Sequence, residues 1–338
     1  MTVATRPETD GVAETPTATP PRRRHWVAAA VAGTVVGVGL TAWLLAGQLR
    51  QVPTVLQSAS WPWALAAFGF VVVANVARAQ RMVSLLSSRM RLARSYEVTC
   101  NYNLATAVLP GGLGELALPV TLNRRDAVPL PEATSTLVLT RLLDIVGVLA
   151  VGLVSAVVAP HVGGWRLLAV AVTAVGLAAS IVLVHRTAWL AARLRPAHDR
   201  GGRLRRLLAI RVTALADAMR AQHRRIGRAA IAGTAVMWLA TAGMQVAVAR
   251  SFGVPLPWAA GGLAAVVVLL LAAIPIRSVA GIGLQEAGWT LALTAFAHDT
   301  HDAAAHALAI HVLTLALLLG LWGTGWLTGR LSRAILAP

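Results

Sequence analysis

The sequence lacks lysine, has a single cysteine and contains few charged residues of any kind. Only 13% of its 338 residues are Asp, Glu, Lys or Arg, and all 30 basic residues are arginine. The lone Cys100 excludes an internal disulfide bond and a metal site built from several cysteines. A hydrophobic content of 57% and a mean hydropathy of +0.68 exclude an ordinary soluble domain. Because no alternating strand pattern is present either, the sequence predicts an all-α integral membrane protein.

The formal net charge of +17 raises the question of a nucleic-acid partner. Twelve arginines lie between Arg186 and Arg228 and five between Arg78 and Arg94, in both cases next to apolar stretches. Such enrichment is typical of cytoplasmic loops, and no aromatic residues are interleaved to stack on single-stranded nucleic acid. We therefore expect no nucleic-acid partner, and a multi-pass protein of the cell membrane with cytoplasmic N- and C-termini.

Six stretches are long and apolar enough to cross the membrane as helices, which takes roughly 20 residues for about 30 Å of hydrocarbon. The predicted spans are residues 27–47, 61–77, 134–158, 165–185, 229–250 and 303–327. The predicted divisions of the chain are a disordered cytoplasmic N-terminus at 1–25, a membrane domain at 26–330 and a cytoplasmic tail at 331–338. Within the membrane domain, the basic segment 186–228 is expected to be cytoplasmic, either as a surface helix on anionic lipid or as a solvated linker.

Two further apolar regions, residues 96–123 and 258–297, do not fit as ordinary spans. The arginine distribution assigns both ends of each region to the same side of the membrane, so each region has to enter and return. The first contains AVLPGGLGELAL and the second AAIPIRSVAGIGLQEAGW, and both place a proline and a Gly-x-Gly ahead of a glutamate. The pattern predicts two oppositely oriented re-entrant helical hairpins related as an inverted repeat, although glycine and proline are common in membrane helices in any case.

The interrupted helices indicate where a ligand binds. A helix that restarts inside the membrane presents unpaired backbone N–H groups, which favour an anion such as a phosphate or a carboxylate. The second half-helices are expected to begin near Glu115 and Glu286, after glycines that permit a tight turn and close approach of the ligand. The two glutamates either cap their own half-helices or take part in function, and the two roles are compatible.

Charged residues inside the membrane region are further candidates. Arg141 and Asp144 share one face of a predicted span, where they either only pair with each other or also let Arg141 contact an anionic head group. Arg277 lies inside the second interruption. Arg78 and Arg81 end a span, where they either gather lipid phosphates at the cytoplasmic face or are simple topogenic charge, which explains them better. The predicted substrate-binding residues are Gly112, Gly114, Glu115, Arg141, Asp144, Arg277, Gly281, Gly283 and Glu286. No catalytic residue, metal site or cofactor is expected.

Three segments resemble the membrane domain of the lysylphosphatidylglycerol synthase/flippase family, namely GGLGELALPVTLNRR, TRLLDIVG and IPIRSVAGIGLQE. The resemblance covers roughly residues 27–330. It implies a lipid-translocating unit, which in some members is fused to a cytoplasmic aminoacyl-transferase domain. The chain ends eleven residues after the last predicted span, so we expect neither that domain nor any enzymatic activity.

The chain also departs from the family pattern. Relatives often carry an arginine at the position of Leu118 and a glutamate at the position of Thr140, and their second interruption often has Pro-Gly-Gly at residues 279–281. The matching positions are Glu115, Arg141, Asp144, Pro275, Gly283 and Glu286. The missing arginine concerns the identity of the head group rather than the architecture.

These features together predict that the protein moves an anionic phospholipid, or a polyprenyl-phosphate-linked intermediate, between membrane leaflets. The head group is expected at the half-helix N-termini near the membrane midplane. One alternative is a secondary transporter of a small anionic solute, with a closed aqueous cavity instead of a lateral opening. Another is a non-catalytic membrane scaffold for a lipid-modifying enzyme or a glycosyltransferase, with segment 186–228 as its docking surface.

Overall fold

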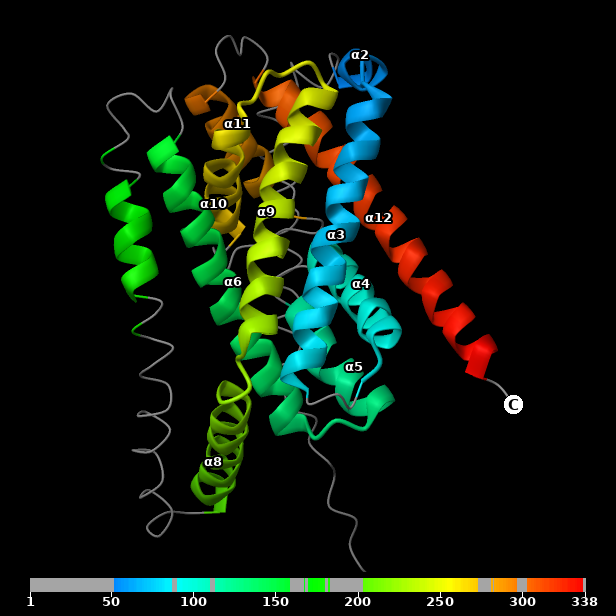
Figure 1. Cartoon of the computed structure of the whole chain (residues 1–338), viewed down its shortest axis with the longest axis vertical. Coiled ribbons are helices and arrows are strands. Elements are labelled where there is room, and N and C mark those ends of the chain that lie inside the picture. Colours follow the sequence, from blue (N-terminus) through cyan, green and yellow to red (C-terminus); the bar gives the residue numbers. More distant parts are fainter. Residues whose placement is uncertain are drawn as a thin grey trace, which may run out of the picture.

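The computed structural model describes a helical protein. The described residues are 52–86, 90–109, 113–158, 170–179, 203–272, 283–296 and 303–336, with isolated positions at 167, 182 and 281. Every element in these ranges is a helix (Figure 1), which confirms the predicted all-α class. The elements are α2 (Val52–Gln57), α3 (Trp61–Leu85), α4 (Leu92–Val108), η1 (Leu113–Leu116), α5 (Ala117–Asp126), α6 (Leu130–Val158), α8 (Arg203–His223), α9 (Arg228–Ser251), η4 (Trp258–Ala260), α10 (Gly261–Ala272), α11 (Leu284–Phe296) and α12 (Ala303–Leu336).

Four of the described helices are long and apolar enough to cross a membrane, namely α3, α6, α9 and α12. They coincide with the predicted spans 61–77, 134–158, 229–250 and 303–327, which are therefore confirmed as helices of spanning length. The predicted span 27–47 lies outside the described residues. The predicted span 165–185 is described mainly at Val170–Ala179, as a shorter apolar helix.

Helix α3 continues beyond its predicted end and packs along α9. Its start is fixed by Pro62 in the first turn, where a missing backbone N–H costs nothing, and by a hydrogen bond from Ser60 N to Ser251 O at the end of α9 (2.7 Å). The prediction ended this span at residue 77, before its arginines, but the helix runs to Leu85. Arg81 consequently lies within the helix and is 1% exposed.

Each of the two regions predicted to be hairpins is interrupted. In the first, α4 ends at Val108 and the short helix η1 leads into α5, and all three pack together. In the second, α10 and α11 pack against each other on either side of residues 273–280, which lie outside the described residues. Figure 1 places α4 and α5 toward the lower end of the molecule and α10 and α11 toward the upper end.

The packed centre of the protein lies where α11 and α12 meet the helices α3, α4 and α9. Trp289, Leu293 and Ile310 are fully buried there and belong to a single apolar cluster with Val246 of α9. This core fixes the second interrupted region against the spanning helices, because its largest side chain, Trp289, follows the start of α11 by only five residues. The polar groups described below lie around this core.

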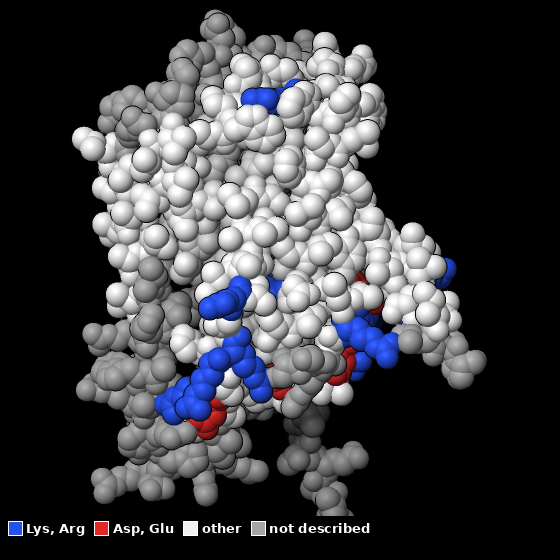
Figure 2. Space-filling view, viewed as in Figure 1, with Lys and Arg blue, Asp and Glu red and all other residues white. Residues whose placement is uncertain are grey.

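The described charges gather at one end of the molecule. Figure 2 shows most arginines of the viewed face in its lower part, the end to which α8 extends in Figure 1. Helix α8 occupies part of the basic segment 186–228 and packs on the start of α6 through Gln222, which accepts from Ser135 Oγ (2.5 Å) and donates to Thr136 Oγ1 (2.9 Å). At least this part of the segment is therefore a packed helix rather than a linker.

Candidate functional site

The first interruption holds a cluster of polar side chains from three elements. Arg141 of α6 forms an ion pair with Glu115 of η1, and its Nε donates to Glu115 Oε2 at 2.9 Å. Tyr102 of α4 donates its hydroxyl proton to Glu115 Oε2 (2.5 Å) and accepts from Arg141 Nη2 (2.6 Å). Both oxygens of the carboxylate are thus engaged by side chains, so Glu115 ties three elements together instead of serving only as a cap.

A second ion pair continues this cluster toward α3 and α9. Asp144 lies 2.7 Å from Arg81 Nη2, and Arg81 Nη1 donates to Thr234 Oγ1 at 3.2 Å. The predicted contact of Arg141 with Asp144 is present at 3.6 Å, but each residue has a closer charged partner. Both members of the Arg81–Asp144 pair are buried, with side chains 1% and 8% exposed. Removing Asp144 would leave the buried Arg81 without its carboxylate partner in a medium of low dielectric constant.

Arg78 belongs to a separate chain of hydrogen bonds that leads from α3 into α4. Its guanidinium donates to Asn103 Oδ1, and Asn103 Nδ2 donates to Asn75 Oδ1 at 2.7 Å. Asn75 Nδ2 donates in turn to Cys100 Sγ at 3.1 Å. The interpretation of Arg78 and Arg81 as simple topogenic charge is therefore wrong, because both enter the polar interior of the protein.

A cavity of about 300 Å³ lies beside Arg78 and reaches both interrupted regions. Thr106 and Ala107 line it from the end of α4, and Gln285 lines it from the start of α11. Its other lining residues are Val71, Ala74, Asn75, Arg78, Asn103, Trp238, Thr241, Met244, Gln245, Ala265, Val268, Thr314, Leu318 and Leu321. We call this space the central cavity. One cation and several amides and hydroxyls share it with aliphatic side chains, as expected of a site for an amphiphile with a polar head.

The second interruption is built around Glu286. Its Oε2 accepts from the backbone N–H of Gly283 (2.6 Å), so the carboxylate caps the helix that begins at the next residue. Its Oε1 lies 2.6 Å from Nδ1 of His311 on α12, and both side chains are buried. His311 Nε2 has no hydrogen-bond partner among the described residues. Capping and a further polar role are thus combined in this residue.

Glycine is required in the two interruptions for different structural reasons. Gly281 and Gly283 have positive φ angles of 71° and 98°, a conformation that side chains disfavour. Gly114 is buried, and a Cβ atom there would overlap Ala105 O and Thr106 Cα of α4. Close approach to the protein's own backbone, rather than to a ligand, therefore explains this glycine.

The structure describes seven of the nine predicted substrate-binding residues. It brings Glu115, Arg141 and Asp144 together at the first interruption, with Gly114 beside them, and groups Gly281, Gly283 and Glu286 at the second. Gly112 and Arg277 lie outside the described residues. In the described part of the chain, no group of His, Cys, Asp and Glu side chains is arranged to hold a metal ion.

Several polar residues near the interruptions were not predicted from the sequence. Asn103 and Tyr102 were missed because each is unremarkable in its local pattern, and their partners are distant in the chain. Arg78 was noticed, but only as a charge at the end of a span. His311 carried a usable signal, since an ionisable side chain inside a predicted span indicates function by default.

A comparison with protein families agrees with this architecture. The family model described as the lysylphosphatidylglycerol synthase TM region matches residues 29–323. No curated protein and no solved structure matches the chain. The match spans the central cavity and both interrupted regions, and it extends over most of the 338 residues. This chain therefore belongs to the family of the lysylphosphatidylglycerol synthase membrane region.

Proposed function

We propose that the protein translocates an anionic lipid or lipid-linked intermediate between the two leaflets of the cell membrane. The observation that carries the proposal is the central cavity, because it combines a cation, neutral hydrogen-bonding groups and aliphatic walls and is lined by residues of both interrupted regions. The chain belongs to a family of membrane regions named for a lipid synthase, which agrees with a lipid substrate. Arg78 would attract the phosphate, while Asn103 and Gln245 would offer amide hydrogen bonds.

The size of the cavity favours entry of the head group alone. Its volume of about 300 Å³ is at the low end of the roughly 300–1,000 Å³ that is usual for small-molecule sites. The acyl chains would therefore remain outside, in the hydrocarbon. A lateral opening toward the lipid is required for this arrangement and distinguishes it from a closed pathway for a small solute.

We infer further that the two interrupted regions are re-entrant hairpins related as an inverted repeat. The placement of α4 with α5 and of α10 with α11 toward opposite ends supports this arrangement (Figure 1). The basic end of the molecule would face the cytoplasm, because arginine is retained on that side. Broken backbone at membrane depth is tolerated where it lines a cavity, and the central cavity meets that condition.

The Glu115–Arg141 and Arg81–Asp144 pairs would lie beside the cavity and would link the first interrupted region to the neighbouring long helices. We expect these links to move with that region. They join η1 to α6 and α6 to α3, so a shift of η1 changes the surroundings of both arginines. An ion pair between interrupted and continuous helices can hold two alternative arrangements of a transporter. Glu286 and His311 would hold the second region against α12 in the same way.

The proposal is tested with the purified protein in liposomes that contain a trace of head-group-labelled or chain-labelled lipid. Labelled phosphatidylglycerol, phosphatidylcholine and a polyprenyl phosphate would be compared by quenching from outside. We expect faster loss of the protected fraction for an anionic lipid than in protein-free liposomes, and a weaker preference for anionic lipid in Arg78→Gln. Uptake of a soluble anion without any lipid movement would instead favour the solute transporter.

A further inference from the structure

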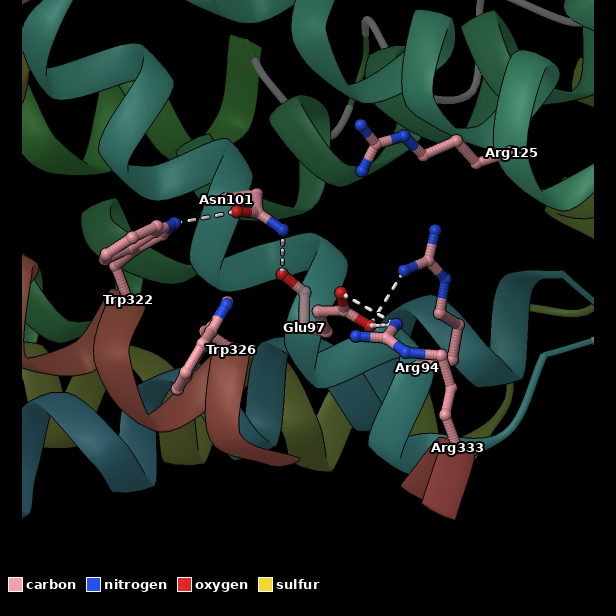
Figure 3. Close-up of a pocket in the computed structure, with 7 residues that line it drawn as sticks. All are labelled: Arg94, Glu97, Asn101, Arg125, Trp322, Trp326 and Arg333. Atoms are coloured by element: carbon pink, nitrogen blue, oxygen red, sulfur yellow. Dashed lines mark hydrogen bonds and ion pairs between the residues drawn. The ribbon is translucent and has the colours of Figure 1, made fainter. Parts of the chain in front are cut away.

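A second pocket lies away from the central cavity, where α4, α5 and α12 meet at the basic end (Figure 3). Its volume is about 700 Å³. The lining residues are Arg94, Glu97, Asn101, Arg125, Trp322, Trp326 and Arg333. We call it the basic–aromatic groove. No residue of the groove lines the central cavity, so the two spaces are distinct.

The groove lies beside a close contact between α12 and α4, two of the helices that line it. A Cβ atom at Gly325 would lie 2.6 Å from Cys100 Cβ, and one at Gly329 would meet the carboxylate of Glu97. These glycines, four residues apart on one helix face, let the two backbones approach closely. Beyond the contact, the end of α12 diverges from the other helices in Figure 1. The groove is consequently a built feature of the helix packing.

The groove has more positive than negative charge. Glu97 is contacted by Arg94 (2.8 Å) and by Arg333 (3.3 Å), and Arg94 also pairs with Asp126 (2.8 Å). Arg125 extends from α5 toward the same space, and its guanidinium has no hydrogen bond or ion pair in the described part of the chain. The groove is thus lined by three guanidinium groups and one carboxylate, and the guanidinium of Arg125 has no counter-ion among the described residues.

The aromatic residues give the groove an amphipathic character. Trp322 donates from Nε1 to Asn101 Oδ1 at 2.9 Å, and the Trp326 ring lies 4.1 Å from the guanidinium carbon of Arg330. Both tryptophans are exposed, at 40% and 46%. Leu327 and Leu331 are also exposed on this stretch of α12. Tryptophan beside arginine at the end of an apolar helix is typical of the membrane–water interface.

We infer that the basic–aromatic groove binds the phosphate-bearing head group of an anionic lipid from the leaflet at the basic end. Arg125 and Arg333 would contact the phosphate, and the tryptophans would pack on the glycerol region and upper acyl chains. A lipid is favoured over a free phosphate because the exposed rings of Trp322 and Trp326 line the groove and suit the apolar part of a lipid. The inference is independent of the proposed translocation, because it concerns equilibrium binding to one leaflet.

Lipid binding would be measured by native mass spectrometry of the detergent-purified protein. The probes are phosphatidylglycerol, phosphatidylcholine, and inorganic phosphate as a soluble competitor. We expect tighter binding of phosphatidylglycerol than of phosphatidylcholine. The substitutions Arg125→Gln and Arg333→Gln should each weaken phosphatidylglycerol binding about fivefold, as expected for one arginine near an anionic surface. The control is Arg124→Gln, which removes the same charge from an exposed neighbour outside the groove.

Three results would overturn the inference. Unchanged affinity in both groove variants would show that the arginines do not contact the lipid. An equal loss in Arg124→Gln would show a general effect of surface charge instead of a site. Effective competition by millimolar inorganic phosphate would indicate a soluble anion as the ligand.

Discussion

At the scale of single residues, charge pairs connect helices that are distant in the chain. Arg81 and Asp144 are separated by 63 positions in sequence and form a buried pair at 2.7 Å. Their burial does not by itself mean that the pair stabilises the fold, since desolvation offsets much of the attraction. It does mean that neutralising Asp144 alone leaves Arg81 in an unfavourable environment.

The first prediction concerns this pair. Asp144→Asn should lower the free energy of unfolding by about 3 kcal/mol, because it leaves buried Arg81 without its closest counter-ion. The double variant Arg81→Gln with Asp144→Asn should recover much of that loss. Thermal unfolding of both variants in detergent is the measurement. If the double variant unfolds at no higher temperature than Asp144→Asn alone, loss of the ion pair is not the cause of the destabilisation.

The same residues show where sequence reasoning is effective and where it is not. Glu115, Arg141 and Asp144 were found because charge inside an apolar stretch is unusual, and the structure brings them together. The pairing of Arg141 with Glu115 and that of Asp144 with Arg81 were not predicted, because each joins residues of different elements. Spacing along one helix indicates only the contact within it, which is the longer one at 3.6 Å.

At the scale of helices, composition and hydropathy predict which segments can cross the membrane. The residue at which each helix ends depends on contacts inside the protein. The predicted spans at 61–77 and 303–327 are both shorter than the helices that contain them. Each helix continues through arginines, because Arg81 finds an internal partner and Arg333 reaches Glu97. A prediction that ends each span before the first charged residue therefore misses the last turns of these helices.

The packing of α12 on α4 provides a prediction at this scale. Gly325→Ala should destabilise the protein by roughly 1–3 kcal/mol, because the added methyl group would overlap Cys100. Gly323→Ala on the same helix is the matched control, since a Cβ atom there meets nothing within 4 Å. We expect the control to be neutral or slightly stabilising. Equal thermal stability of the two variants would rule out close packing as the role of Gly325.

At the scale of the whole molecule, the orientation of the two interrupted regions determines the transport model. A Cys100→Ala background permits single cysteines to be labelled from either side of the membrane. Cysteines at Arg91 and Asn123, which are exposed at the two ends of the first region, should both react from the cytoplasm. Those at exposed Pro255 and at Asp299 should both react from outside. Reaction of Arg91→Cys and Asn123→Cys from different sides would exclude the inverted repeat.

In the proposed mechanism, a lipid head group passes through the central cavity. Thr314 of α12 lines this cavity, whereas Leu319 of the same helix is 55% exposed on the outer surface. Thr314→Trp would fill the cavity with an indole ring, and Leu319→Trp would add the same ring outside it. The decisive measurement is the rate of labelled phosphatidylglycerol translocation in liposomes that contain equal amounts of each folded variant. We expect a rate near that of protein-free liposomes for Thr314→Trp and a wild-type rate for Leu319→Trp. Wild-type translocation by Thr314→Trp would contradict passage through the central cavity.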